Sequence, residues 1–305
     1  MQIIEQQIIG QYKILTKIGR GSTADVWSGE HLINKDKVAL KIYSHAEHLE
    51  AISEELFTQE FITTKKLYHP NILNALDFFV VDHTPILVFD LCETSLEKEI
   101  GERKIIALEN GIDTKALFTD HEIIDIVTQI LHGLIFLHAN GIIHNDIKPA
   151  NIVMKRLASQ KNQYFIIDFG ISLDLKRITK NDQKNEIAKG KTVLYAAPEK
   201  LKGIDDEPKS DIFSLGVLVY ELAGGKNTAL LPGEIIDRGG KLKLDGRSED
   251  DLVIRILEKC LHKNISNRPS PVQLLKFIQV NNKHRKFEHI KSRLYNCVKK
   301  IFSST

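Results

Sequence analysis

The amino-acid sequence predicts an α+β protein of two unequal lobes, a small β-rich N-lobe followed by a larger α-helical C-lobe. The first 90 residues hold short apolar runs separated by polar or glycine-containing turns, which is typical of strands. Beyond residue 90, apolar residues recur every three or four positions, which is typical of buried helices. We therefore divide the 305 residues into an N-lobe at 1–90, a C-lobe at 91–280 and a C-terminal tail at 281–305.

The N-lobe is expected to consist mainly of strands. Apolar, β-branched or aromatic runs predict strands at residues 12–15, 24–27, 38–42, 73–79 and 85–89. Residues 50–68 have helical spacing instead and predict one helix between the third and fourth strands.

The C-lobe is expected to be built around one long buried helix. Its apolar face comprises Ile123, Ile124, Val127, Ile130, Leu131, Leu134, Ile135 and Leu137. Further helices are predicted at residues 210–223, 249–261 and 271–279, and residues 90–93 connect the lobes. Residues 97–120 are charged and weakly periodic, so they form either a loop or a short extra helix.

Several classes of protein are excluded by composition. The three cysteines, Cys92, Cys260 and Cys297, have no paired spacing, which argues against a zinc site or a disulfide framework and favours a reducing compartment. The N-terminus lacks a positive segment followed by an apolar run, and no stretch reaches about 18 uncharged apolar residues. We expect a cytoplasmic protein with no transmembrane segment and no nucleic-acid partner, while its oligomeric state stays open.

Positive charge is concentrated in the C-terminal tail. Residues 281–305 hold seven Lys or Arg and one acid, a net charge of +6, whereas the whole chain has a net charge of +2. The apolar residues of the tail recur at helical spacing and are Phe287, Ile290, Leu294, Val298 and Ile301. Such an amphipathic helix either packs on the acidic remainder of the protein or makes a peripheral contact with anionic lipid or an acidic partner.

A glycine-containing turn lies between the first two predicted strands. Residues 19–26 read Gly-Arg-Gly-Ser-Thr-Ala-Asp-Val, and glycines at such a turn let backbone N–H groups approach phosphate oxygens. The signal is weak by itself, because an ordinary hairpin turn has a similar sequence.

Two later motifs are much more specific. Residues 144–151 read His-Asn-Asp-Ile-Lys-Pro-Ala-Asn, and residues 166–170 read Ile-Ile-Asp-Phe-Gly. Asp146 can accept a proton from an attacking hydroxyl, and Lys148 can neutralise a γ-phosphate during transfer. Asn151 and Asp168 offer oxygen ligands to a hard cation such as Mg²⁺.

With these motifs, the chain resembles the eukaryotic-type protein kinase family over nearly residues 10–280. The glycine-containing turn, the Val-Ala-Leu-Lys run at 38–41, both motifs above and Ala-Pro-Glu at 197–199 occur in the family's order. Asn267-Arg268-Pro269 also resembles the segment whose arginine pairs with the family's Ala-Pro-Glu glutamate, here Glu199. The resemblance implies a kinase-like bilobal fold and transfer of the γ-phosphate of Mg-ATP, with Mn²⁺ as a substitute metal, to a protein substrate.

Residue roles follow from the resemblance position by position. Lys41 would bind the α- and β-phosphates and pair with Glu60, while Asp146 and Lys148 would act at the transferred phosphoryl group. Thr192, together with Lys148, resembles serine/threonine rather than tyrosine kinases. The residues implied around the nucleotide are Ile18, Gly19, Gly21, Ala24, Val26, Ala39, Lys41, Phe89, Asp90, Cys92 and Val153, and those implied at the metal are Asn151 and Asp168.

The sequence departs from the family at a few positions. Ala24 replaces the third glycine of the turn, and Thr64 stands where the family usually has an apolar residue. Asn145 replaces the arginine that usually precedes the catalytic aspartate and that receives a phosphate from the activation segment. Because an amide cannot pair with a phosphate dianion as arginine does, we expect activity without phosphorylation of that segment.

Two other functions compete with a protein kinase. A small-molecule kinase of similar fold would share the catalytic motifs, but it would generally lack the Lys148-Pro149 pair and the Ala-Pro-Glu platform. A pseudokinase acting as a binding module would typically have lost Lys41, Asp146 or Asp168, all of which are present here.

Overall fold

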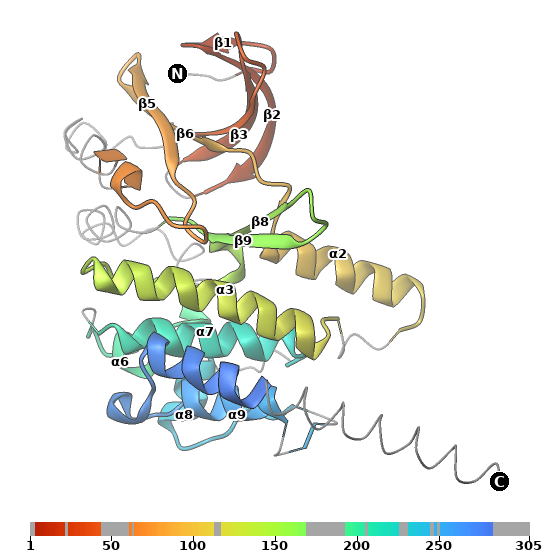
Figure 1. Cartoon of the computed structure of the whole chain (residues 1–305), viewed down its shortest axis with the longest axis vertical. Coiled ribbons are helices and arrows are strands. Elements are labelled where there is room, and N and C mark those ends of the chain that lie inside the picture. The colour runs from red at the N-terminus through yellow and green to blue at the C-terminus, as the bar shows by residue number, and fades with distance from the viewer. Residues whose placement is uncertain are drawn as a thin grey trace, which may run out of the picture.

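The computed structural model describes residues 4–21, 24–43, 61–62, 64–112, 117–168, 193–204, 207–225, 231–244, 247–248 and 251–282. Within this set the predicted α+β class with two lobes is confirmed: a curled sheet lies above a mainly helical body (Figure 1). Glu60, Thr192, most of the predicted helix at 50–68 and the tail from residue 283 lie outside the described residues.

The N-lobe sheet contains six antiparallel strands in the order β1-β2-β3-β4-β6-β5. The strands are β1 (Ile8–Ile9), β2 (Tyr12–Arg20), β3 (Asp25–His31), β4 (Lys37–Ile42), β5 (Ala75–Val81) and β6 (Thr84–Asp90). All five predicted strands are present, but β2 is longer than predicted, and the two-residue β1 is too short to show a sequence period.

The tight hairpin between β5 and β6 fixes the position of β6. Its two central residues, Asp82 and His83, have φ angles of 47° and 58°. Positive φ at both central positions suits the right-handed twist of the flanking strands. The turn pairs Val81 with Thr84, and β6 then leads along the sheet to the segment that joins the lobes.

The C-lobe surrounds the long helix α3, as predicted. Its helices are α2 (Leu96–Glu109), α3 (Asp120–Ala139), η3 (Pro149–Asn151), α6 (Pro198–Leu201), α7 (Lys209–Leu222), α8 (Pro232–Asp237), α9 (Leu252–Cys260) and η4 (Ile265–Asn267), followed by helical residues 271–282. A second, small sheet contains β7 (Thr94–Ser95), β8 (Ile152–Arg156) and β9 (Asn162–Ile166).

The charged segment at 97–120 resolves mainly into a helix. Ser95 caps α2 by accepting a hydrogen bond from the Lys98 N–H, and α3 begins at Asp120 behind a reciprocal capping box of Thr119 and Glu122. The periodicity of α2 is weak in the sequence because apolar residues such as Leu108 are exposed on its surface.

The packing of α3 against β9 positions the segment that carries Asp168. A Cβ atom at Gly133 would lie 2.7 Å from Ile166 Cδ1 and 3.1 Å from the Asn71 carbonyl oxygen, so glycine allows this close approach. In the described part of the chain, only α3 has the length and apolar composition of a membrane-crossing helix, and half of that stretch is buried inside the protein.

Candidate active site

The loop that follows α3 carries the first group of predicted catalytic residues. His144 is 1% exposed, its Nδ1 accepts from the Asp146 N–H at 3.2 Å, and its Nε2 lies 2.9 Å from the Ile167 carbonyl oxygen. With Nδ1 as acceptor, Nε2 carries the proton and donates to Ile167. His144 therefore joins the catalytic loop to the segment before Asp168 and has a packing role.

The buried carboxylate of Asp211 holds the same loop from α7. Its Oδ2 accepts from the His144 N–H at 2.9 Å and lies 2.8 Å from His138 Nε2, and its Oδ1 accepts from the Asn145 N–H at 2.7 Å. The side chain is completely buried, so these donors replace the water that an ionised carboxylate would otherwise need. This anchoring role was not predicted, although a charged residue at the start of an apolar helix was a signal for it.

The side chain of Asp146 is contacted by both Lys148 and Asn151. Lys148 Nζ lies 3.1 Å and 2.9 Å from the two carboxylate oxygens of Asp146, and Asn151 Nδ2 donates to the Asp146 carbonyl oxygen at 2.8 Å and to Oδ2 at 3.2 Å. Asp146 is only 8% exposed. A carboxylate held in this way can take a proton from a hydroxyl while the adjacent ammonium stabilises negative charge on a phosphoryl oxygen.

Lys41 of the N-lobe reaches Asp168 of the C-lobe. Lys41 Nζ lies 2.5 Å from Asp168 Oδ1, and the Asp168 backbone has a left-handed φ of 62°. A residue other than glycine in this conformation is strained, and such strain is common at functional sites. Burial disfavours ionisation of Asp168, but attraction to Lys41 and its hydrogen bond outweigh it, so the pKa of Asp168 lies below its ordinary value.

The oxygen atoms near Asp168 suit a divalent cation. The Asn151 carbonyl oxygen accepts from the Ile167 N–H at 3.0 Å, which places Asn151 beside the residue before Asp168. The amide nitrogen of Asn151 is used by Asp146, and no described residue donates to its Oδ1. An amide oxygen and an ionised carboxylate are ligands that hard cations prefer, so these two residues fit a metal.

The strands bring several predicted nucleotide-binding residues together. Gly19 pairs with Val26 and Val26 pairs with Lys41 across β2, β3 and β4, while Ala39 pairs with Phe89 across β4 and β6. The Lys98 ammonium donates to the Ile18 carbonyl oxygen at 2.8 Å, a contact between α2 and the N-lobe that the sequence did not suggest.

The glycine-containing turn is closed by its own backbone. The Gly21 N–H donates to the Ala24 carbonyl oxygen at 2.8 Å, and a Cβ atom at Gly21 would lie 3.0 Å from that same oxygen. Ala24 itself is 2% exposed, so the methyl group that replaces the family's glycine is accommodated in the lobe interior.

The segment joining the lobes lies against both of them. The Leu91 N–H donates to the Lys37 carbonyl oxygen at 3.4 Å, the Glu93 N–H donates to the Met154 carbonyl oxygen at 2.9 Å, and Asp90 ends β6. Burial raises the pKa of Cys92 to about 12, so its thiol stays protonated at neutral pH. Val153 lies on β8 of the second sheet, where it pairs with Ser95 and Phe165.

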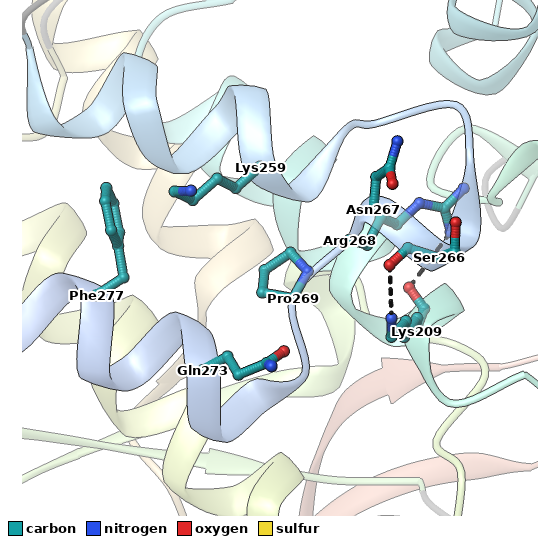
Figure 2. A pocket seen from close by; sticks show the side chains of 8 residues that line it. All are labelled: Lys209, Lys259, Ser266, Asn267, Arg268, Pro269, Gln273 and Phe277. Atoms are coloured by element: carbon teal, nitrogen blue, oxygen red, sulfur yellow. Dashed lines mark hydrogen bonds between the residues drawn. The ribbon is translucent and has the colours of Figure 1, made fainter.

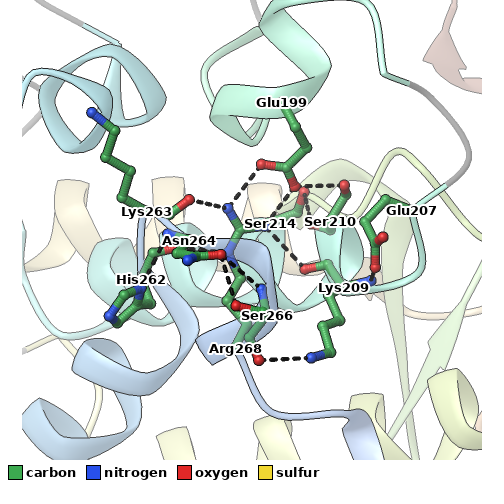
Figure 3. A network of polar contacts seen from close by, with 10 residues as sticks. All are labelled: Glu199, Glu207, Lys209, Ser210, Ser214, His262, Lys263, Asn264, Ser266 and Arg268. Carbon is green, nitrogen blue, oxygen red and sulfur yellow. Dashed lines mark hydrogen bonds and ion pairs between the residues drawn. The ribbon is translucent and has the colours of Figure 1, made fainter.

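The predicted pairing of Arg268 with Glu199 is present (Figure 3). Nη1 and Nη2 of Arg268 lie 2.5 Å and 2.8 Å from the two carboxylate oxygens of Glu199, and Ser210 Oγ donates to Oε1 at 2.7 Å. Burial alone would raise the pKa of Glu199, but these hydrogen bonds lower it below its ordinary value. The pair fixes α6 against the start of α7.

A cavity of about 410 Å³ lies beside this pair, and Arg268 forms part of its lining (Figure 2). Its lining residues are Lys209, Lys259, Ser266, Asn267, Arg268, Pro269, Gln273 and Phe277. None of them is among the predicted catalytic, metal or nucleotide residues.

Comparison with known proteins agrees with this geometry. The chain belongs to the protein kinase domain family, which matches residues 12–278. It is 31% identical over 226 residues to the serine/threonine-protein kinase PrkC of Bacillus subtilis, covering 73% of this chain and 32% of that protein. It is 29% identical over 217 residues to the probable serine/threonine-protein kinase PknB of Lactococcus lactis, covering 71% and 32%.

A third relative matches over a larger share of its own length. The chain is 30% identical over 275 residues to the serine/threonine-protein kinase nekl-2 of Caenorhabditis elegans, covering 87% of this chain and 72% of that protein. The chain spans about a third of the length of the two bacterial relatives. Family membership implies protein substrates, ATP and a divalent cation in general.

Proposed function

We propose that this chain is a serine/threonine protein kinase that transfers the γ-phosphate of Mg-ATP to a protein hydroxyl. The observation that carries the proposal is the ion pair between Lys41 and Asp168, which brings the predicted phosphate-binding residue of one lobe to the predicted metal-binding residue of the other. The cluster of Asp146, Lys148 and Asn151 supports it, because it supplies a proton acceptor, a cation and a metal ligand on one loop.

The chemical step follows from these residues. Asp146 orients the acceptor hydroxyl and takes its proton as the oxygen forms a bond to Pγ. The bond from Pγ to the β–γ bridging oxygen breaks, and the electron pair leaves with ADP. Lys148 stabilises the charge on the transferred phosphoryl group, and Lys41 holds the α- and β-phosphates. Asn151 and Asp168 would hold Mg²⁺, which supplies charge neutralisation on the phosphates when bound.

Activity does not depend on phosphorylation of the activation segment. Asn145 supports this proposal, because its amide cannot pair with a phosphate as the usual arginine does. The enzyme acts in the cytoplasm, in keeping with three cysteines that have no paired spacing in the sequence. The tail at 281–305 either packs on the C-lobe or binds anionic lipid. These two possibilities are distinguished by co-sedimentation of the full chain, and of residues 1–280 alone, with anionic vesicles at low salt.

The experiment that tests the proposed reaction supplies γ-labelled ATP and Mg²⁺ with a mixture of protein acceptors or with small hydroxyl acceptors such as choline and an aminoglycoside. We expect label on protein serine or threonine without any small acceptor. Label that appears only on a small acceptor would assign the alternative small-molecule kinase, and no label on any acceptor with Mg²⁺ or Mn²⁺ would favour the pseudokinase.

A further inference from the structure

Asn145, directly before the predicted catalytic Asp146, is held through its backbone in the part of the chain that the structure describes. Its φ is 64°, and the amide atoms Nδ2 and Oδ1 are buried and hydrogen-bond to no described residue. Its backbone N–H donates to Asp211 Oδ1 at 2.7 Å, and its carbonyl oxygen accepts from Lys200 Nζ at 2.6 Å. The peptide groups on both sides of this left-handed residue are therefore fixed by charged partners.

Lys200 reaches this carbonyl from a rigid support. It lies on α6 directly after Glu199, which is 5% exposed and bonded by Arg268 and Ser210. Lys200 as a whole is half-buried, and its hydrogen bond to the loop is partly shielded from water. A hydrogen bond from a charged donor is stronger than one between neutral groups, particularly where water is partly excluded.

We propose that Lys200 is a positioning residue for the catalytic loop: its ammonium fixes the Asn145 carbonyl and so the direction in which the chain presents Asp146. The cation comes from α6 itself, so the loop is held without a phosphate on the activation segment. This inference rests on the proposed function for its kinetic consequence, but its structural consequence can be measured separately.

If Lys200 positions the catalytic loop, its loss should slow the chemical step more than it weakens the binding of substrates. Lys200 touches neither Lys41 nor Asp168 among the described contacts, so the apparent affinity for ATP should be unaffected by its loss. A displacement of Asp146 by a fraction of an ångström to 1 Å would lower kcat by about 10- to 100-fold.

The test compares Lys200→Met, Lys200→Arg and Lys202→Met with the wild-type chain. Methionine keeps the length and removes the charge, and arginine keeps the charge. Lys202 is the matched control, because it is exposed and its ammonium contacts Asp237 at 2.8 Å instead of the loop. Each variant is measured for kcat, for KM of ATP and of a protein acceptor, for Tm, and for amide hydrogen exchange in a peptide spanning residues 143–148.

We expect Lys200→Met to lower kcat about 10- to 100-fold with KM for ATP within about twofold, and to speed exchange at residues 144–145. Lys200→Arg should recover most of both losses, and Lys202→Met should match the wild type. Unchanged kcat and exchange in Lys200→Met would overturn the inference, as would a rise only in KM for the protein acceptor, which would make Lys200 a substrate contact.

The exchange measurement keeps the two proposals apart. If the wild type transfers no phosphate, the proposed function fails, while faster exchange in Lys200→Met would still support the structural contact. If Lys200→Met does not fold, the folded Lys200→Arg variant must retain slow exchange at residues 144–145; fast exchange there would overturn the inference.

Discussion

Removing the side chain of Arg268 should strongly destabilise the C-lobe. The side chain is 1% exposed, its Nε donates to the His262 carbonyl oxygen at 2.7 Å, and its two terminal nitrogens bond the carboxylate of Glu199. The guanidinium carbon also lies 4.9 Å from the centre of the Phe213 ring. In an Arg268→Ala variant, Glu199 would remain buried with Ser210 as its remaining side-chain hydrogen-bond donor among the described residues.

The cost of that substitution can be estimated from the structure. Removing one partner of a buried ion pair costs about 3–5 kcal/mol, because the remaining charge is left without compensation. The entropy of unfolding of roughly 2.1 cal/mol/K per residue gives about 0.6 kcal/mol/K for a chain of this size, so Tm should fall by about 5–8 °C. Differential scanning calorimetry measures Tm, and urea titration measures the free energy of unfolding.

Two further variants sharpen this test. Arg238→Ala removes an exposed arginine and should change Tm by no more than about 1 °C. The double variant Arg268→Met with Glu199→Leu should lose less stability than Arg268→Ala, because no buried carboxylate remains unpaired. A Tm within about 2 °C of wild type for Arg268→Ala, or a larger loss in the double variant, would show that an unpaired Glu199 carboxylate does not destabilise the C-lobe.

Four other outcomes follow from the same geometry. Asp168→Asn should lower kcat by about 10²-fold or more with an unchanged Tm, because the substitution weakens a proposed metal ligand and its contact with Lys41. Near-normal turnover of a folded Asp168→Asn variant would exclude the role of Asp168 as a metal ligand. Enzyme treated with phosphatase, and shown by mass spectrometry to carry no phosphate on residues 171–190, should keep its initial rate of phosphate transfer. A large drop in this rate that recovers on autophosphorylation would contradict this. Burial raises the pKa of Cys92 and Cys260 to about 12, so iodoacetamide should label both slowly at pH 8 and rapidly after unfolding; fast labelling of the folded chain would show that they are accessible as thiolates. Because the pKa of Glu199 is lowered in the folded protein, its ionised carboxylate contributes fully to stability above its ordinary pKa of about 4.5, and this contribution is lost as the pH falls through the lower folded pKa. The Tm of Glu199→Gln should therefore fall less steeply with acid than the Tm of the wild type. Identical pH profiles of Tm for the two proteins would reject this cause.

The parts of the site that the sequence predicts are those whose chemistry is local. Asp146, Lys148 and Asn151 lie within six positions of one another, so their convergence follows from one short loop after a helix. The strands of the N-lobe were also predictable, because each has an apolar run bounded by turn residues.

Long-range contacts were harder to predict. Asp211 lies 66 positions after Asn145 and Lys200 lies 55 positions after it, and no local pattern indicates that they bind the two peptide groups that flank Asn145. Likewise, α2 is obscured in the sequence because its exposed apolar residues blur the helical period that burial would produce. The polar groups that hold the catalytic loop could therefore be identified only from the three-dimensional structure.

Asp146 is the residue proposed to enable the transfer of phosphate from Mg-ATP to protein hydroxyls. The most direct measurement is a quantitative phosphosite map of a protein mixture after incubation with Mg-ATP and either the wild-type chain or Asp146→Ala, with Tm measured for both. We expect new phosphoserine or phosphothreonine sites with the wild type and a loss of at least about 10²-fold in their rate of appearance with a folded Asp146→Ala. Equal phosphorylation by both proteins, or none by the wild type, would contradict the account.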